Sequence, residues 1–202
     1  SKDPIPNFRK LMNNEISGKM KTPSIGGGTA RTEFEVMTGI DLEFLTDGEV
    51  PHYTILGHET LNSVATTLKK QGYSAHAIHN NQGNFYNRNK AYSSLGYDTY
   101  TSVEYMDNVE RTETNWAKDT VLTKYIKECL DSTEENDLVF TISVEGHSPY
   151  PTDSDKYDFP IKVVSSSLPD TETNQIYYYI NKIHESDEFI GDVVDLVDSM
   201  EE

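Results

Sequence analysis

The chain has 202 residues, of which 34 are acidic and 17 basic, so its formal net charge is −17 at pH 7. This length fits one domain, or two small ones, with a substantial core. Such an acidic balance argues against nucleic acid or anionic lipid as a partner of the surface as a whole, because proteins that bind phosphate backbones normally carry a basic face. No apolar run reaches membrane-spanning length, so we expect the chain itself to be soluble. The single cysteine, Cys129, excludes an internal disulfide.

Helical spacing of apolar residues predicts helices over residues 4–14, 58–70, 84–95, 118–130, 172–184 and 187–200. Small and apolar residues that alternate over 74–79 and a nearly continuous apolar run over 137–144 predict two strands, with a short extended piece over 97–101 and a loop over 40–57. Helices and strands alternate through the middle of the chain. The expected fold class is therefore α/β, a three-layer α/β/α sandwich with a mostly parallel sheet.

A glycine run, Gly26–Gly28, precedes Thr29 and a predicted helix that ends at Gly39. Thr32 and Glu35 have the spacing of a capping box at the start of that helix. A helix N-terminus presents free N–H groups that favour a phosphate or another oxyanion beside the threonine hydroxyl. A flexible linker followed by a capped helix is the alternative interpretation of the same residues.

Ligands in α/β sheets bind beyond the carboxyl ends of the strands, which selects three loops here. They are the loop holding Thr29, the loop from His79 to Arg88, and the loop over 145–150 that holds His147. Each residue also has a local explanation, since a histidine can cap a strand or bind its own turn and an arginine can sit on a helix surface. The spacing of His76 and His79 argues against a metal pair, because side chains three apart on a strand point to opposite faces.

Three motifs in this order resemble the extracellular catalytic domain of the lipoteichoic acid synthase group, within the sulfatase and alkaline phosphatase superfamily. The motifs are Gly27–Gly39, then His79 followed by Phe85-Tyr86-Asn87-Arg88 and by Tyr92 with Leu95-Gly96-Tyr97-Asp98, and finally Glu145–Tyr150. The resemblance extends from about residue 4 to residue 200. It implies one partial catalytic domain over residues 1–202.

By this resemblance, Thr29 would be the nucleophile and also a ligand of a divalent metal, Mn²⁺ or Mg²⁺. Arg88 would clamp phosphate oxygens, and Tyr86, at a position where the family often has tryptophan, would pack beside the glycerol. His79 and His147 would bind the phosphoglycerol group or donate a proton to the leaving alkoxide. The implied reaction moves phosphoglycerol from phosphatidylglycerol to a glycolipid or glycan acceptor.

The same resemblance implies further metal ligands, a glutamate from a strand before the Thr29 loop and an Asp-His pair after the last helix. This chain has neither. We therefore expect an internal fragment of a membrane-anchored protein whose catalytic domain is extracellular. On its own, the fragment is expected to bind the metal weakly or not at all and to be inactive.

Other functions remain open at this stage. One is a sulfuric or phosphoric ester hydrolase of the same superfamily, and another is a non-catalytic domain that binds envelope material. True sulfatases form an aldehyde from a cysteine or serine, whereas the matching position here is Thr29, followed by Ala30 and Arg31. This difference argues against sulfate esters but not against phosphate esters.

Overall fold

The computed structural model describes residues 2–22, 24, 27–164 and 166–200. The chain forms two compact units. The first, which we call the sheet unit, consists of residues 19–107 and 125–142, and the second, the helical unit, of residues 1–18, 108–124 and 143–202. The chain therefore passes from one unit to the other after residues 18, 107, 124 and 142.

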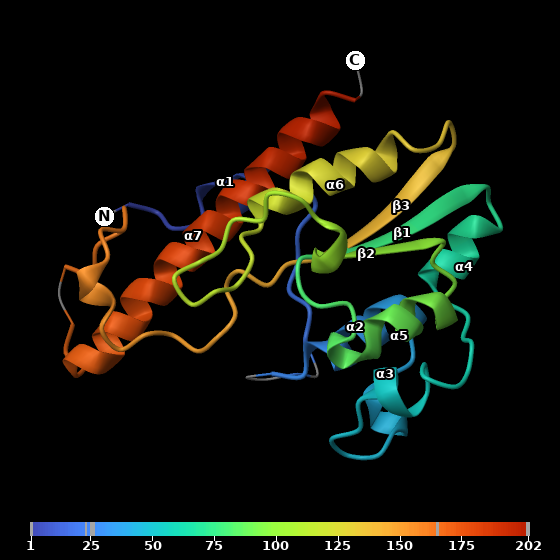
Figure 1. Cartoon of the computed structure of the whole chain (residues 1–202), viewed down its shortest axis with the longest axis horizontal. Helices are drawn as coiled ribbons and strands as arrows, with labels where there is room; N and C mark the ends of the chain where they lie inside the picture. Colours follow the sequence, from blue (N-terminus) through green and yellow to red (C-terminus); the bar gives the residue numbers. More distant parts are fainter. Residues whose placement is uncertain (1, 23, 25–26, 165, 201–202) are drawn as a thin grey trace. The chain divides into compact units, whose positions relative to one another are not determined.

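The sheet unit contains three parallel strands (Figure 1). Strand β1 (Tyr73–His79) lies between β2 (Thr99–Ser102) and β3 (Asn136–Ile142). Both neighbours run parallel to β1, whose last residue is in register with the last residues of β2 and β3. The strands predicted from the apolar runs are thus confirmed, and their carboxyl ends meet at one edge of the sheet.

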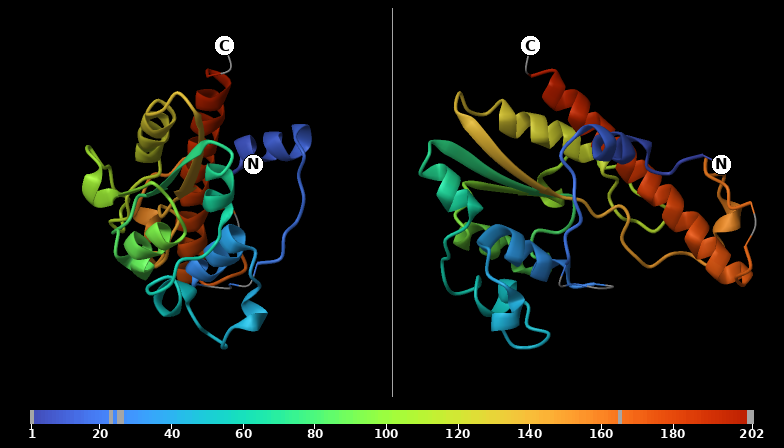
Figure 2. Two further views of the ribbon diagram at one scale, coloured as in Figure 1. Left: turned by 90° about the vertical axis from the view of Figure 1, so that its right-hand side faces the viewer. Right: turned by 180° about the vertical axis from the view of Figure 1, so that it is seen from behind.

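Helices cover both faces of this sheet (Figures 1 and 2). The helices α2 (Thr29–Thr38), α3 (Pro51–Thr54), α4 (Val64–Lys69) and α5 (Arg88–Ser94) lie on one side, and the second half of α6 (Thr120–Leu130) lies on the other. The core on the first side is fully buried and contains Phe34, Met37, Ala75, Ala77, Tyr92 and Leu95. Short 3-10 helices complete the unit at Leu42–Phe44, Phe85–Asn87 and Val103–Tyr105. The predicted α/β class with a parallel sheet is confirmed.

The helical unit is organised along one long helix, α7 (Asp170–Asp198). Helix α1 (Pro6–Asn14) packs against it. The Asp187 carboxylate on α7 accepts the backbone N–H groups of Asn7 and Phe8 at 2.9 and 2.8 Å, and so satisfies donors that the first turn of a helix leaves unpaired. The approach is close at Gly191, where an added Cβ would lie 2.9 Å from the Asn7 side chain. A 3-10 helix at Ser154–Lys156 also belongs to this unit.

The long helix corrects one prediction. We expected two helices, over 172–184 and 187–200, but α7 is continuous through Glu185 and Ser186. These polar side chains do not cap a helix end because other residues satisfy them. Glu185 accepts a hydrogen bond from Lys182 at 2.6 Å, and the Ser186 hydroxyl donates to Asp119 at 2.9 Å.

Other boundaries also differ from the prediction. The capping box predicted at Thr32 is wrong, because α2 already begins at Thr29 with Gly28 as its N-cap. Helix α4 begins only after Ser63, which forms a capping box with Thr66. The helix predicted over 84–95 is a 3-10 turn followed by α5, and the loop predicted over 40–57 contains α3 and a 3-10 turn.

Candidate active site

Thr29, the predicted nucleophile, is the first residue of α2, and its side chain is exposed. Gly28 before it has a φ of +72°, a left-handed conformation that costs a residue with a side chain about 1–2 kcal/mol. The Ser24 hydroxyl donates to the Gly28 carbonyl at 2.9 Å and fixes this turn. The first glycine of the run, Gly26, lies outside the described residues. The described part of the turn therefore presents the Thr29 hydroxyl at the positive end of the helix dipole.

One turn further along α2, Glu33 forms the centre of a buried polar cluster. Its side chain accepts hydrogen bonds from Arg88 Nε at 3.1 Å, from Arg88 Nη2 and from the Tyr92 hydroxyl at 3.1 Å. His52 Nε2 lies 3.5 Å from the same carboxylate. Burial alone would raise the pKa of Glu33, but the nearby His52 and the hydrogen bonds from Arg88 outweigh it and lower this pKa to about 2. Glu33 is therefore an anion at neutral pH.

Arg88, the predicted phosphate clamp, is only 1% exposed. Two of its nitrogens bind Glu33, and the third, Nη1, donates to the Phe85 carbonyl at 3.3 Å. Its guanidinium carbon lies 5.2 Å from the centre of the Tyr86 ring. The structure thus brings Arg88 and Tyr86 together and anchors both, through Glu33, to the helix that begins with Thr29. Contact of Arg88 with a phosphate stays a prediction.

Tyr86 lies on a backbone that few non-glycine residues adopt, with φ values of 55° at Tyr86 and 56° at Asn87. The Asn87 amide donates to the His52 carbonyl at 3.0 Å, which helps to hold this conformation. The Tyr86 ring packs edge-on against Phe85 at 4.7 Å and lies 6.2 Å from Tyr53. Left-handed residues of this kind concentrate at binding sites, where the surrounding structure enforces them. The loop therefore presents a small aromatic group beside the Glu33 cluster.

His79 ends the central strand β1, as predicted, and is 2% exposed. Its Nδ1 is hydrogen-bonded to the Ile142 carbonyl at 2.8 Å, so this nitrogen carries the proton. Burial, together with the charge of Arg88, lowers the pKa of His79 to about 4. The ring is neutral near pH 7, with its acceptor lone pair on Nε2. This state favours accepting a hydrogen bond from a substrate hydroxyl over donating a proton.

His147 belongs to the helical unit and is exposed. Its Nδ1 is hydrogen-bonded to the Ser148 carbonyl at 2.7 Å, and its ring lies 4.7 Å from that of Trp116. Asp119 holds the preceding residues, because its Oδ1 accepts the N–H groups of Val144 and Glu145 at 3.3 and 3.2 Å. The loop that carries His147 is thus fixed from within the helical unit. Its placement beside Thr29 stays a prediction.

Glu145, the first residue of the third motif, was given no role from the sequence; it lies two residues before His147 and is 1% exposed. Burial and the neighbouring carboxylates of Glu185 and Asp119 raise its pKa to about 9, so Glu145 is protonated at neutral pH. Glu185, which pairs with Lys182 and Lys118, is correspondingly ionised. Two adjacent carboxylates repel each other, so ionising both costs free energy. Lys118 and Lys182 stabilise the negative charge on Glu185, and Glu145 therefore keeps its proton.

The described residues do not by themselves fit the divalent metal that the resemblance implies. Among residues 2–22, 24, 27–164 and 166–200, no group of three or more His, Cys, Asp or Glu side chains is placed to hold a metal ion. Thr29 supplies one hydroxyl and the buried Glu33 is already occupied by Arg88. Neither side chain completes a metal site with the other described residues.

The chain belongs to the sulfatase family, whose family model matches residues 1–202. Its fold is that of the alkaline phosphatase and sulfatase superfamily. Among curated proteins, it is 31% identical over 193 residues to a Rhizobium meliloti protein assigned to cyclic beta-1,2-glucan modification, and 29% identical over 160 residues to lipoteichoic acid synthase 2 of Bacillus subtilis. These alignments cover 96% and 79% of this chain, but only 29% and 24% of the two relatives.

Two solved structures show the same fold at 20% identity. They are the lipoteichoic acid synthase LtaP of Listeria monocytogenes, with a TM-score of 0.78, and the phosphoglycerol transferase GacH of Streptococcus pyogenes in complex with sn-glycerol-1-phosphate, with a TM-score of 0.82. Each match covers 97% of this chain, and 46% and 51% of the respective structures. Among the described residues, no helix combines the length and the apolar character needed to cross a membrane.

Proposed function

We propose that this chain is part of the catalytic domain of an enzyme that transfers phosphoglycerol from phosphatidylglycerol to a saccharide hydroxyl. One observation carries the proposal: the exposed Thr29 hydroxyl begins α2 one turn before the Glu33–Arg88 cluster. The similarity to a lipoteichoic acid synthase and to a phosphoglycerol transferase supports the reaction class. The relative assigned to glucan modification supports a glycan as the acceptor.

The reaction proceeds in two displacements at phosphorus. In the first, Thr29 Oγ1 forms a bond to phosphorus while the bond from phosphorus to the diacylglycerol oxygen breaks, and the threonine proton leaves with that oxygen. In the second, the acceptor hydroxyl attacks the same phosphorus, and its proton passes to the departing Thr29 oxygen. The N–H groups at the start of α2 stabilise the charge on the phosphate oxygens. Threonine is thereby regenerated.

The other residues bind and orient the transferred group. The Tyr86 ring packs beside the glycerol, and the neutral His79 accepts a hydrogen bond from a glycerol hydroxyl through Nε2. Arg88, held in a fixed orientation by Glu33, stabilises the phosphate. His147 binds the phosphoglycerol or protonates the leaving oxygen. Mn²⁺ or Mg²⁺ bound at Thr29 would require further ligands.

We propose that this domain lies outside the cell, at the membrane that supplies the donor lipid. The test uses the whole protein that contains this chain. Labelled phosphatidylglycerol, Mn²⁺ and a cyclic β-1,2-glucan are incubated with wild-type, Thr29→Ala and Thr29→Ser forms. We expect labelled glucan from the wild type, less from Thr29→Ser and none from Thr29→Ala. The matched control, Thr38→Ala at the other end of α2, should retain activity.

Each contrary outcome points to a different function. Release of glycerol phosphate without labelled glucan would support a phosphoric ester hydrolase. Absence of both products would support a non-catalytic domain that binds envelope material. Transfer retained by Thr29→Ala would remove the nucleophile assignment.

A further inference from the structure

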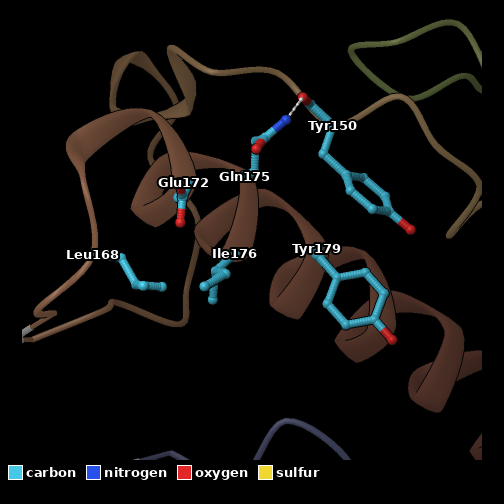
Figure 3. A pocket seen from close by; sticks show the side chains of 6 residues that line it. All are labelled: Tyr150, Leu168, Glu172, Gln175, Ile176 and Tyr179. Carbon is cyan, nitrogen blue, oxygen red and sulfur yellow. Dashed lines mark hydrogen bonds between the residues drawn. The ribbon is translucent and has the colours of Figure 1, made fainter.

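The helical unit contains a groove of about 470 Å³ that the proposed reaction does not use. It is lined by Tyr150, Leu168, Glu172, Gln175, Ile176 and Tyr179 (Figure 3). Three of these residues, Glu172, Ile176 and Tyr179, have the i, i+4, i+7 spacing that places them on one face of α7. Its volume is within the range of sites that bind small ligands.

Aromatic side chains form one end of the groove. The rings of Tyr150 and Tyr179 lie 5.3 Å apart at an interplanar angle of 58°, and Tyr179 is 42% exposed (Figure 3). Leu168 and Ile176 extend this apolar surface and are exposed as well. Large apolar side chains that remain exposed together commonly mark a binding surface. The arrangement offers ring faces against which a flat, partly apolar ligand can pack.

The polar groups of the groove restrict the ligand's charge. Glu172 contributes a carboxylate and Gln175 an amide, whose Nε2 donates to the Tyr150 carbonyl at 3.2 Å. The six lining residues include no lysine or arginine, and the chain as a whole has a net charge of −17. An anionic ligand would therefore be repelled, and an acyl chain would remove the Glu172 carboxylate from water without a hydrogen bond in return. A neutral sugar avoids both the charge repulsion and the unpaired carboxylate. Its C–H faces pack on tyrosine rings, and its hydroxyls donate to carboxylate and amide oxygens.

The groove is connected to the loop that holds His147. The Tyr150 hydroxyl donates to the Gly146 carbonyl at 3.0 Å, so one tyrosine contributes its ring to the groove and its hydroxyl to that loop. We propose that the groove binds a neutral saccharide, and that this saccharide is the acceptor of the transfer; the second half of this statement rests on the function proposed above. Sugar bound at Tyr150 and Tyr179 would lie next to the loop expected to contact the phosphoglycerol.

The test measures binding to the 202-residue chain without a donor lipid, so that it does not depend on transfer. Isothermal titration with a cyclic β-1,2-glucan should show binding to the wild type. Tyr179→Ala should weaken the affinity about tenfold, and Tyr179→Phe should leave it close to wild type, because the ring carries the stacking contact. The matched control is Tyr105→Ala, which removes an exposed tyrosine of the sheet unit and should change nothing. Glu172→Ala, on the exposed face of α7, provides a second variant that should also weaken binding.

Three results would overturn the inference. The first is that the chain binds no glucan, and the second is that both Tyr179→Ala and Glu172→Ala bind it with unchanged affinity. The third is that the chain binds phosphatidylcholine vesicles and Tyr179→Ala abolishes this binding, which would assign the groove to acyl chains. Its failure is separable from that of the proposed function. If Thr29→Ala loses transfer but the wild-type chain binds no glucan, only the assignment of the groove fails. If glucan binding depends on Tyr179 but Thr29→Ala still transfers phosphoglycerol, only the assignment of the nucleophile fails.

Discussion

Replacing Glu33 by glutamine should destabilise the chain strongly, because it removes the countercharge of a buried cation. Among the described residues, Glu33 is the one acidic side chain within ion-pair distance of Arg88, which is 1% exposed. Arg88 donates to both carboxylate oxygens, and a glutamine amide has only one oxygen with which to replace them. The variant would leave a desolvated positive charge without a partner.

The magnitude follows from the electrostatics of the cluster. A pKa lowered from 4.5 to about 2 corresponds to about 3 kcal/mol of preferential stabilisation of the ionised Glu33. Removing one partner of a buried ion pair typically costs about 3–5 kcal/mol, which agrees with this value. We therefore expect Glu33→Gln to lower the free energy of unfolding by about 3 kcal/mol, a large part of the total for a typical protein.

Urea denaturation followed by circular dichroism at pH 7 measures the effect. The pKa of Glu33 is lower in the folded state than in the unfolded state, so its stabilisation is complete above pH about 4.5 and is lost as the pH falls towards about 2. The variant should lack this part of the acid dependence. Glu59→Gln, at an exposed position of the sheet unit, is the matched control.

The double variant Glu33→Leu with Arg88→Met leaves neither charge buried and should recover much of the lost stability. A loss below about 1 kcal/mol in Glu33→Gln, or an acid dependence equal to that of the wild type, would refute the assignment of Glu33 as the countercharge that stabilises the cluster.

Three further predictions concern other parts of the chain. Gly28→Ala should lower Tm by about 2–8 °C, because alanine is strained at a φ of +72°, whereas Gly18→Ala, with no positive φ and no close neighbours, should not. Glu145 has a raised folded-state pKa of about 9, so stability should fall as the pH rises from about 4.5 to about 9, and Glu145→Gln should flatten this fall in thermal melts. Burial raises the pKa of Cys129 to about 11; its reaction with a disulfide reagent at pH 8 should be roughly a hundredfold slower in the folded chain than in urea.

Local patterns in the sequence predicted the parts of the fold that depend on neighbours along the chain. The alternating small and apolar residues before His79 predicted a strand, and the structure has β1 there. The glycines before Thr29 predicted the start of a helix, and α2 begins at that threonine. Gly39 likewise ends α2 in the left-handed conformation expected of a C-cap. Tertiary contacts decided the rest. The polar residues Glu185 and Ser186 in the middle of α7 predicted a break, but Lys118 and Asp119, far away in the sequence, pair with them and the helix continues.

The Glu33 cluster could not be predicted in the same way. Glu33, His52 and Arg88 are far apart in the sequence, and each alone resembles an ordinary surface residue. The sequence contained one signal for it. Glu33 lies beside Phe34 and one turn after Thr29, on a helix whose apolar face has to be buried, so a buried carboxylate could be expected there. Such spacing indicates which side of α2 faces the core, but it does not identify the cation that meets the carboxylate.

The course of the chain through the two units has a practical consequence. Because the chain passes between them four times, and α6 contains the boundary after residue 124, neither unit corresponds to a continuous stretch of sequence. No single cut in the gene would therefore separate them, and a truncated clone that ends at any of these boundaries would encode one unit without some of its own segments. Isolating either unit for study would require a circular permutation or an engineered linker in place of the other.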